Sequence, residues 1–321
     1  MSEQPNVQTI DKVVIRFSGD SGDGMQLVGN IFSNVSAGEG NMISTFPDYP
    51  AEIRAPQGSL SGVSGFQVSV GKEVHTPGDN ADVLVAMNPA ALKTNLQYLK
   101  PGGIIICDAD SFTEANLKKA LYKTDDPIQE LGIDPDRIML VPMTTLLKNT
   151  LADSGLDNKS IMKCKNMLAL GLICWLFDRP VDKVLAKLKA KFAKKPAIYE
   201  ANEKVINAGW DYGHNTHAGM PTYRIESDAA KPGVYTDING NTATAWGLIM
   251  ASEKSHRPLF LGSYPITPAT DILHELAKRK DLGVKACQME DEIAGSMSRT
   301  AHFGQSVCGY LAYRQIPIQI A

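Results

Sequence analysis

The sequence predicts an α/β protein with a mostly parallel sheet, because short apolar segments typical of buried strands alternate with segments of helical periodicity. The first such strand, Val13–Phe17, precedes a glycine-rich stretch and a helical pattern that begins at Met25. The alternation resumes near residue 240, after a segment rich in glycine and histidine. These observations predict two α/β units within the 321 residues, each long enough to bury a core.

The other elements of the first unit follow from apolar periodicity and turn residues. The helix from Met25 would bury one face, made of Leu27, Val28, Ile31, Phe32 and Val35. Strands are expected at Met42–Phe46, at Leu60–Val70 with one exposed face, and at Val83–Met87 and Ile104–Cys107. A helix over Pro89–Leu99, stopped by Pro101-Gly102-Gly103, separates the last two strands, and two to three helices span Ile161–Gly209.

A change of composition predicts the domain boundary. Glycine, histidine, asparagine and proline come close together between Trp210 and Gly233, with little apolar periodicity. We therefore expect a first domain over 1–212, a linker over 213–232 and a second domain over 233–321. The second domain should contain helices and strands in alternation, over Asn241–Ala251, Leu259–Gly262, Ala269–Lys278 and Val284–Gln288, with another helix from Asp291.

Composition excludes several classes of function. The net charge of −3 does not suit a nucleic-acid partner. The longest apolar run, Met167–Phe177, is too short to cross a membrane and suits a buried helix. The N-terminus lacks the regions of a signal peptide, so a cytoplasmic location is expected. No pair of the five cysteines has C-x-x-C spacing, which predicts reduced core thiols, no metal site, and any iron–sulfur cluster on another chain.

The glycine-rich loop Gly19-Asp20-Ser21-Gly22-Asp23-Gly24 joins the first strand to the first helix. Unhindered backbone amides at a helix start favour an anion such as a phosphate. The glycine spacing and the lack of an acid closing the second strand disfavour NAD. Gly22-Asp23-Gly24 also matches the start of the metal motif of thiamine enzymes, in which a later asparagine completes the magnesium shell. Phe46–Arg54 contains no asparagine, so magnesium diphosphate is disfavoured here. The diphosphate of coenzyme A remains, beside the alternative that the loop only packs helix against strand.

Two motifs mark the second domain. In Tyr264-Pro265-Ile266-Thr267-Pro268, two prolines stiffen a turn between strand and helix, with Thr267 expected as N-cap and Pro268 as first helical residue. Glu290-Asp291-Glu292 follows the next strand. Such acids usually only complement a helix dipole. The alternative is that one of them is the glutamate with which thiamine enzymes bond the cofactor's pyrimidine ring.

These two motifs together resemble the pyrimidine-binding domain of 2-oxoacid:ferredoxin oxidoreductases, and the first two hundred residues resemble the γ domain of that family. The γ-like segments are Arg16–Gly24, Tyr49–Arg54, Asn166–Gly171 and Glu200–Asn202. A γ domain fused ahead of a pyrimidine-binding domain is similar to the α subunit of the 2-oxoglutarate enzyme. The expected fold is thus a γ-type α/β domain with a mostly parallel sheet, followed by an incomplete thiamine-pyrimidine-binding α/β domain.

The resemblance implies a function and its site residues. The family decarboxylates a 2-oxoacid on thiamine diphosphate, passes electrons through [4Fe-4S] clusters to ferredoxin and transfers the acyl group to coenzyme A. By resemblance, the loop of Gly19, Asp20, Ser21, Gly22, Asp23 and Gly24 would contact coenzyme A. Thr267, with Tyr264 and Pro265, would face substrate and thiazolium, and Glu292, or else Glu290, would bond the pyrimidine. A β subunit would hold thiamine diphosphate, Mg²⁺ and the cluster.

The resemblance covers residues 12 to about 294, and the tail from about 297 matches nothing expected of the family. We expect that a frameshift or truncation replaced the continuation, leaving a γ domain that folds and a second domain that does not. The alternative to the enzyme is then a non-catalytic subunit that binds coenzyme A or aids assembly. Pyruvate and branched-chain 2-oxoacids are alternative substrates.

Overall fold

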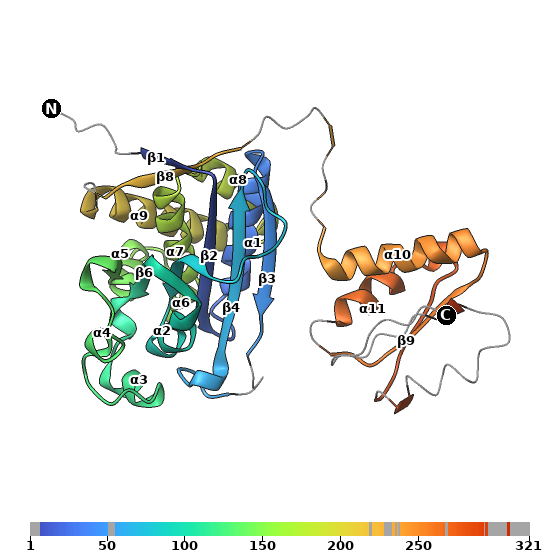
Figure 1. Cartoon of the computed structure of the whole chain (residues 1–321), viewed down its shortest axis with the longest axis horizontal. Coiled ribbons are helices and arrows are strands. Elements are labelled where there is room, and N and C mark those ends of the chain that lie inside the picture. Colours follow the sequence, from blue (N-terminus) through green and yellow to red (C-terminus); the bar gives the residue numbers. More distant parts are fainter. Residues whose placement is uncertain are drawn as a thin grey trace. The chain divides into compact units, whose positions relative to one another are not determined.

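The computed structural model describes residues 7–50, 55–217, 220–227, 233–234, 236, 238–266, 269–291, 293–294 and 307–308. The chain divides into two compact units, Met1–Gly233 and Val234–Ala321. The division falls at the start of the expected second domain. Each unit is an α/β structure in its own right (Figure 1).

A six-stranded sheet forms the first unit. Its strands lie in the order β3 (Met42–Asp48), β4 (Val63–Gly71), β2 (Lys12–Asp20), β5 (Ala81–Ala86), β6 (Leu99–Asp108) and β7 (Ile138–Val141). The neighbours from β2 to β7 pair in parallel, whereas β4 runs antiparallel to both β3 and β2. The predicted mostly parallel sheet is confirmed, with one reversed strand inserted next to β2.

Helices cover both faces of this sheet. The larger core lies between one face and α1 (Met25–Gly38), α7 (Lys165–Leu176) and α9 (Pro196–Thr216). On the other face, α2 (Pro89–Asn95) packs against Leu84 and Ile105. Shorter or outlying helices are α3 (Glu114–Lys119), α4 (Pro127–Glu130), α5 (Met143–Thr150), α6 (Asn158–Met162) and α8 (Val181–Lys191). Because both faces are covered, β5 and β6 are apolar without alternation.

Two expectations for the strands were wrong. β4 is buried on both faces, because the turn after it covers the face that was expected to be exposed: the Gln67 amide donates to the Pro77 carbonyl at 3.1 Å. Pro101-Gly102-Gly103 lies inside β6 instead of ending the helix before it, and the pairing of β6 with β5 shifts register between Ala81 and Val83.

The expected linker 213–232 is also corrected. α9 continues to Thr216, and β8 (Thr222–Ile225) pairs in parallel with β1 (Val7–Ile10). Gly213 is inside the helix because of packing: a Cβ atom there would lie 2.4 Å from the Trp175 ring. The glycine that suggested a turn thus allows close contact between two helices.

The second unit is smaller. α10 (Gly240–Ser255) and α11 (Thr270–Ala277) pack on a parallel sheet in the order β10 (Lys285–Gln288), β9 (Leu259–Ser263) and β11 (Val307–Cys308). The four predicted elements up to Gln288 are confirmed within a few residues. Of the described residues, no helix is both long and apolar enough to cross a membrane.

Candidate functional site

The glycine-rich loop forms a compact turn where β2 ends. The Asp20 amide donates to the Asp23 carboxylate at 2.9 Å, and the Asp23 amide donates to the Asp20 carbonyl at 3.0 Å. Gly22 and Gly24 have φ angles of 102° and 78°, a region that favours glycine. No side chain of the described residues caps α1, so the first amides of that helix have no side-chain hydrogen-bond partner there.

Asn166, in the first turn of α7, contacts the end of this loop. Its side-chain nitrogen lies 3.4 Å from the Gly24 carbonyl oxygen, and a Cβ atom on Gly24 would lie 2.2 Å from the same nitrogen. The side chain is 5% exposed, and its Oδ1 has no hydrogen-bond partner among the described residues. Gly24 is therefore required both by its φ angle and by close packing on α7.

Buried charges surround the loop at the carboxyl edge of the sheet. Asp108, at the end of β6, is wholly buried and accepts from the Met143 amide at 3.1 Å and from Lys165 Nζ at 3.0 Å. Burial raises the pKa of the Asp23 carboxyl, while the hydrogen bond from the Asp20 amide and the charge of Lys165 act in the opposite direction. The carboxylates of Asp20 and Asp108 and the ammonium of Lys165 thus lie close enough to Asp23 to influence its charge.

Replacing Asp23 by asparagine should stabilise the protein at neutral pH. The asparagine oxygen can still accept from Asp20, but the desolvated charge is gone. Because folding raises the pKa of this carboxyl, the wild type loses stability as pH rises from the ordinary Asp range through the folded-state pKa. The unfolding free energy of D23N should exceed that of the wild type at about pH 8 and approach it at about pH 4. An equal difference at both pH values would contradict this cause.

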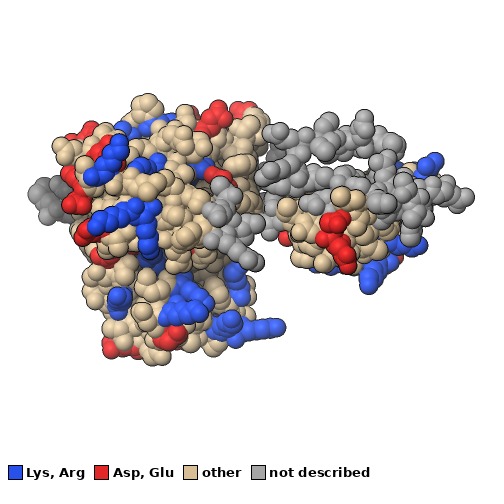
Figure 2. Space-filling model, turned by 90° about the horizontal axis from the view of Figure 1, so that it is seen from below, with Lys and Arg blue, Asp and Glu red and all other residues tan. Residues whose placement is uncertain are grey.

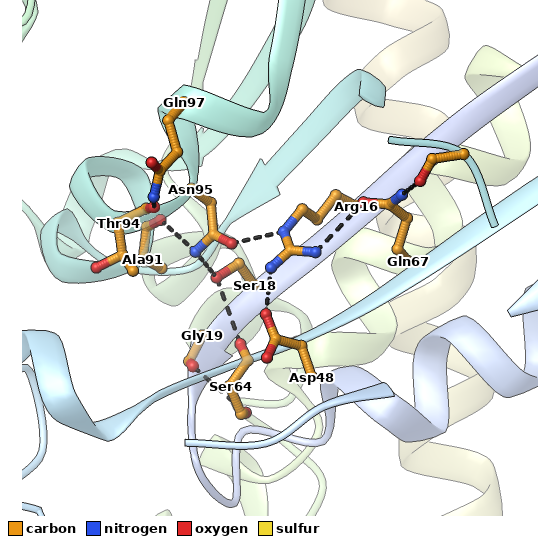
Figure 3. A network of polar contacts seen from close by, with 11 residues as sticks. Arg16, Ser18, Gly19, Asp48, Ser64, Gln67, Ala91, Thr94, Asn95 and Gln97 are labelled. Atoms are coloured by element: carbon orange, nitrogen blue, oxygen red, sulfur yellow. Dashed lines mark hydrogen bonds and ion pairs between the residues drawn. The ribbon is translucent and has the colours of Figure 1, made fainter. Parts of the chain in front are cut away.

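A buried polar network fixes the strand that carries the loop (Figure 3). Arg16, in β2, is 5% exposed, and its guanidinium donates to Asn95 Oδ1 at 2.6 Å, to Gln67 and to Asp48. Asn95 in turn donates to Ser18 Oγ at 2.6 Å. Arg16 belongs to the γ-like segment found in the sequence, but these partners were not predicted. An arginine inside an apolar strand is the signal that could have indicated them, because a buried charge needs hydrogen-bond partners.

In the second unit, the two predicted motifs follow neighbouring strand ends. Ser263 of β9 and Gln288 of β10 are register partners, and the Met289 amide donates to the Ser263 carbonyl at 2.9 Å. The two motifs, which start at Tyr264 and Glu290, therefore lie at the same edge of the sheet. Thr267, Pro268 and Glu292 lie outside the described residues.

The expected start of α11 is corrected. The helix begins at Thr270 with Ala269 as its N-cap, two residues after Thr267. The Thr270 amide donates to the Ile266 carbonyl at 2.9 Å, a bond that joins the start of α11 to the described end of the Tyr264–Ile266 segment.

The cysteines are only partly core residues. Cys107, Cys164 and Cys174 are buried, and burial raises the pKa of Cys174 to about 12. Cys287 is exposed, contrary to expectation, because β10 presents it away from the small core. Among the described residues, no group of three His, Cys, Asp or Glu side chains could hold a metal ion.

Residues 14–212 match the family described as pyruvate ferredoxin/flavodoxin oxidoreductase. The 2-oxoglutarate oxidoreductase subunit KorA of Mycobacterium tuberculosis is 48% identical over 292 residues, which are 91% of this chain and 45% of that protein. The common gamma subunit of the pyruvate/ketoisovalerate oxidoreductases of Thermococcus litoralis is 27% identical over 199 residues, 59% of this chain and 99% of that subunit.

Among solved structures, a 2-oxoglutarate:ferredoxin oxidoreductase from Magnetococcus marinus, with 2-oxoglutarate, coenzyme A and succinyl-CoA bound, matches with a TM-score of 0.68. The match covers 93% of this chain and 47% of that one at 24% identity, so it supports the fold. This chain spans about half the length of the KorA relative and of this structure.

Fold and loop together define the first unit as an α/β domain with a glycine-rich loop and an uncapped helix start at the carboxyl edge of its sheet. The match over 14–212 covers well over half of the chain. The chain belongs to the pyruvate ferredoxin/flavodoxin oxidoreductase family, which confirms the resemblance found in the sequence.

Proposed function

We propose that this chain is the α subunit of a 2-oxoglutarate:ferredoxin oxidoreductase, which decarboxylates the 2-oxoacid oxidatively to an acyl-CoA and passes the electrons to ferredoxin. One observation carries the proposal. The 48% identity to a 2-oxoglutarate oxidoreductase subunit covers 91% of the chain and therefore extends through both units. The residues that contact coenzyme A and the residues that contact thiamine diphosphate would then lie on one polypeptide.

The first unit would supply the contact with coenzyme A, as a γ domain over 1–212. The amides that begin α1, beside Gly22 and Gly24, fit a phosphate oxygen because no side chain of the described residues occupies them. A separate gamma subunit that is 27% identical to 199 residues of this chain supports a unit with a function of its own.

The second unit would supply contacts to thiamine diphosphate. Tyr264, Pro265 and Thr267 would face substrate and thiazolium, and Glu292 would bond the pyrimidine ring. The cofactor with its Mg²⁺ and the [4Fe-4S] cluster would be held mainly by a β subunit, and the assembled enzyme would work with ferredoxin in the cytoplasm.

The test is an assay of the chain copurified with its iron–sulfur β subunit, with methyl viologen as electron acceptor. We expect dye reduction that requires both 2-oxoglutarate and coenzyme A, with a higher kcat/KM for 2-oxoglutarate than for pyruvate or 2-oxoisovalerate. A preference for either of the latter would overturn the substrate. Binding of coenzyme A without turnover of any 2-oxoacid would instead support a non-catalytic subunit.

A further inference from the structure

We propose that Lys119, at the end of α3, is the cation that recognises a phosphate group of coenzyme A at the Gly19–Gly24 loop. The inference rests on the proposed function, because it assigns a further residue to the same site. The loop carries two carboxylates and no positively charged side chain of its own. Asp20 and Asp23 belong to the loop itself, and one oxygen of Asp20 is buried without a hydrogen-bond partner among the described residues. Backbone amides beside two carboxylates do not favour a polyanion unless a cation is added.

Lys165 does not supply that cation. Its ammonium lies 3.0 Å from the wholly buried Asp108 carboxylate, and its side chain is only 17% exposed. Taking Lys165 away would leave a buried carboxylate uncompensated, which is costly. A ligand phosphate therefore needs another positive group, one that the protein does not already use.

Lys119 meets this need because it lies beside a turn that the loop holds. Asp20 Oδ2 accepts from the Gly58 amide at 2.9 Å, and the Ser21 amide donates to the Gly62 carbonyl at 3.1 Å. On the other side of the turn, a Cβ atom on Gly58 would lie 3.4 Å from Lys119 Cδ. The Lys119 stem thus rests on Gly58, whose amide is bonded directly to the loop.

Packing fixes this end of α3 against the same turn. Leu117 and Ala120, on either side of the lysine pair, are buried in a small cluster that also contacts Leu60. The Lys119 side chain is exposed, and within the described part of the chain its ammonium forms no ion pair. Figure 2, which views the molecule from below Figure 1, shows several Lys and Arg side chains on this face of the first unit, together with Asp and Glu side chains.

The neighbouring residue provides a matched control. Lys118 has the same charge on the same helix turn and is also exposed, but it is paired with Glu114 four residues earlier. Removal of the Lys118 charge should leave the loop unaffected, whereas removal of the Lys119 charge should weaken phosphate binding. Glutamine keeps most of the stem at either position, which preserves packing on Gly58.

The experiment measures the Kd of coenzyme A by calorimetry for the full chain in complex with its β subunit. We expect K119Q to raise the Kd roughly tenfold, the size of one charge-assisted hydrogen bond, and K118Q to change it less than about twofold. K119R should restore binding. The wild-type Kd should also rise more steeply with salt than that of K119Q.

Equal Kd values for K119Q and K118Q would overturn the role of Lys119 while leaving the coenzyme A site in place. Absence of binding to the wild type would instead overturn the proposed function. A repeat with 3′-dephospho-CoA identifies the phosphate: loss of the K119Q effect assigns the contact to the 3′-phosphate, and its retention assigns it to the diphosphate. Melting temperatures of the variants, expected to match the wild type, show that the changes in Kd are not caused by unfolding.

Discussion

Replacing Gly171 by alanine is expected to destabilise the first unit by about 3 kcal/mol or more, the upper end of the cost of overpacking. Gly171 lies where α7 crosses α9, and a Cβ atom there would be 2.0 Å from the Ile206 carbonyl oxygen and 2.9 Å from its carbon. The opposing group is helix backbone, which cannot move aside by changing a rotamer. Gly209 of α9 faces the Leu168 carbonyl in the same way, so each helix contributes one glycine to the crossing.

Chemical denaturation of the full chain, followed by circular dichroism, measures this effect. The unfolding transition of G171A should shift to much lower denaturant, because a loss of this size is a large part of the about 5–15 kcal/mol that holds a domain folded. G38A is the matched control, since a Cβ added at that position near the end of α1 would have no atom within 4 Å apart from its chain neighbours and the backbone of its own helix. An unchanged midpoint for G171A would show that the two helices can separate at little cost.

The structure explains why some of the fold could be predicted and some could not. β2, β5 and β6 are recognisable because strands buried on both faces leave continuous apolar runs. The α7 helix is recognisable for the same reason, since Met167–Phe177 is buried all round. The position of β4 is not encoded locally: only its pairing with both β2 and β3 makes it an antiparallel interior strand.

The glycines show the same limit more sharply. Gly22 and Gly24 were interpreted correctly as loop residues, and their positive φ angles agree with that reading. Gly213 has the same identity but lies inside α9, where it makes room for Trp175 from a helix 38 residues away in the chain. A single sequence does not distinguish a glycine needed for conformation from one needed for close packing.

The candidate site could be located but not completed. The loop was found because strand, glycines and helix are consecutive in the sequence. The residues that contact or surround the loop come from distant segments of the chain. The Gly58 amide donates to Asp20, 38 residues away, and Lys165 pairs with Asp108, 57 residues away. Such contacts depend on the strand order, which local patterns do not reveal.

Replacing Glu292 by glutamine is expected to lower kcat for 2-oxoglutarate by about a hundredfold or more, the usual cost of losing a proton-transferring group. In the proposed site this carboxyl bonds the pyrimidine ring and favours the tautomer that activates thiamine diphosphate. Glutamine has nearly the same shape but cannot hold or release a proton, so cofactor binding should be kept while turnover is lost. The Kd of coenzyme A should not change, because its proposed site is on the first unit.

Glu290 provides the comparison, as an acid two residues away that also follows β10. Glu290 directly follows Met289, whose amide donates to the Ser263 carbonyl at the end of β9. E290Q should therefore retain kcat within about threefold in the methyl viologen assay of the α–β complex, since Glu290 is exposed and precedes Asp291, whose carboxylate accepts from the Ala294 amide at 2.6 Å. A large loss in E290Q with normal turnover in E292Q would transfer the role to Glu290. Normal turnover in both variants would contradict a pyrimidine contact from this strand end, because Glu292 and Glu290 are the two carboxylates proposed for that contact.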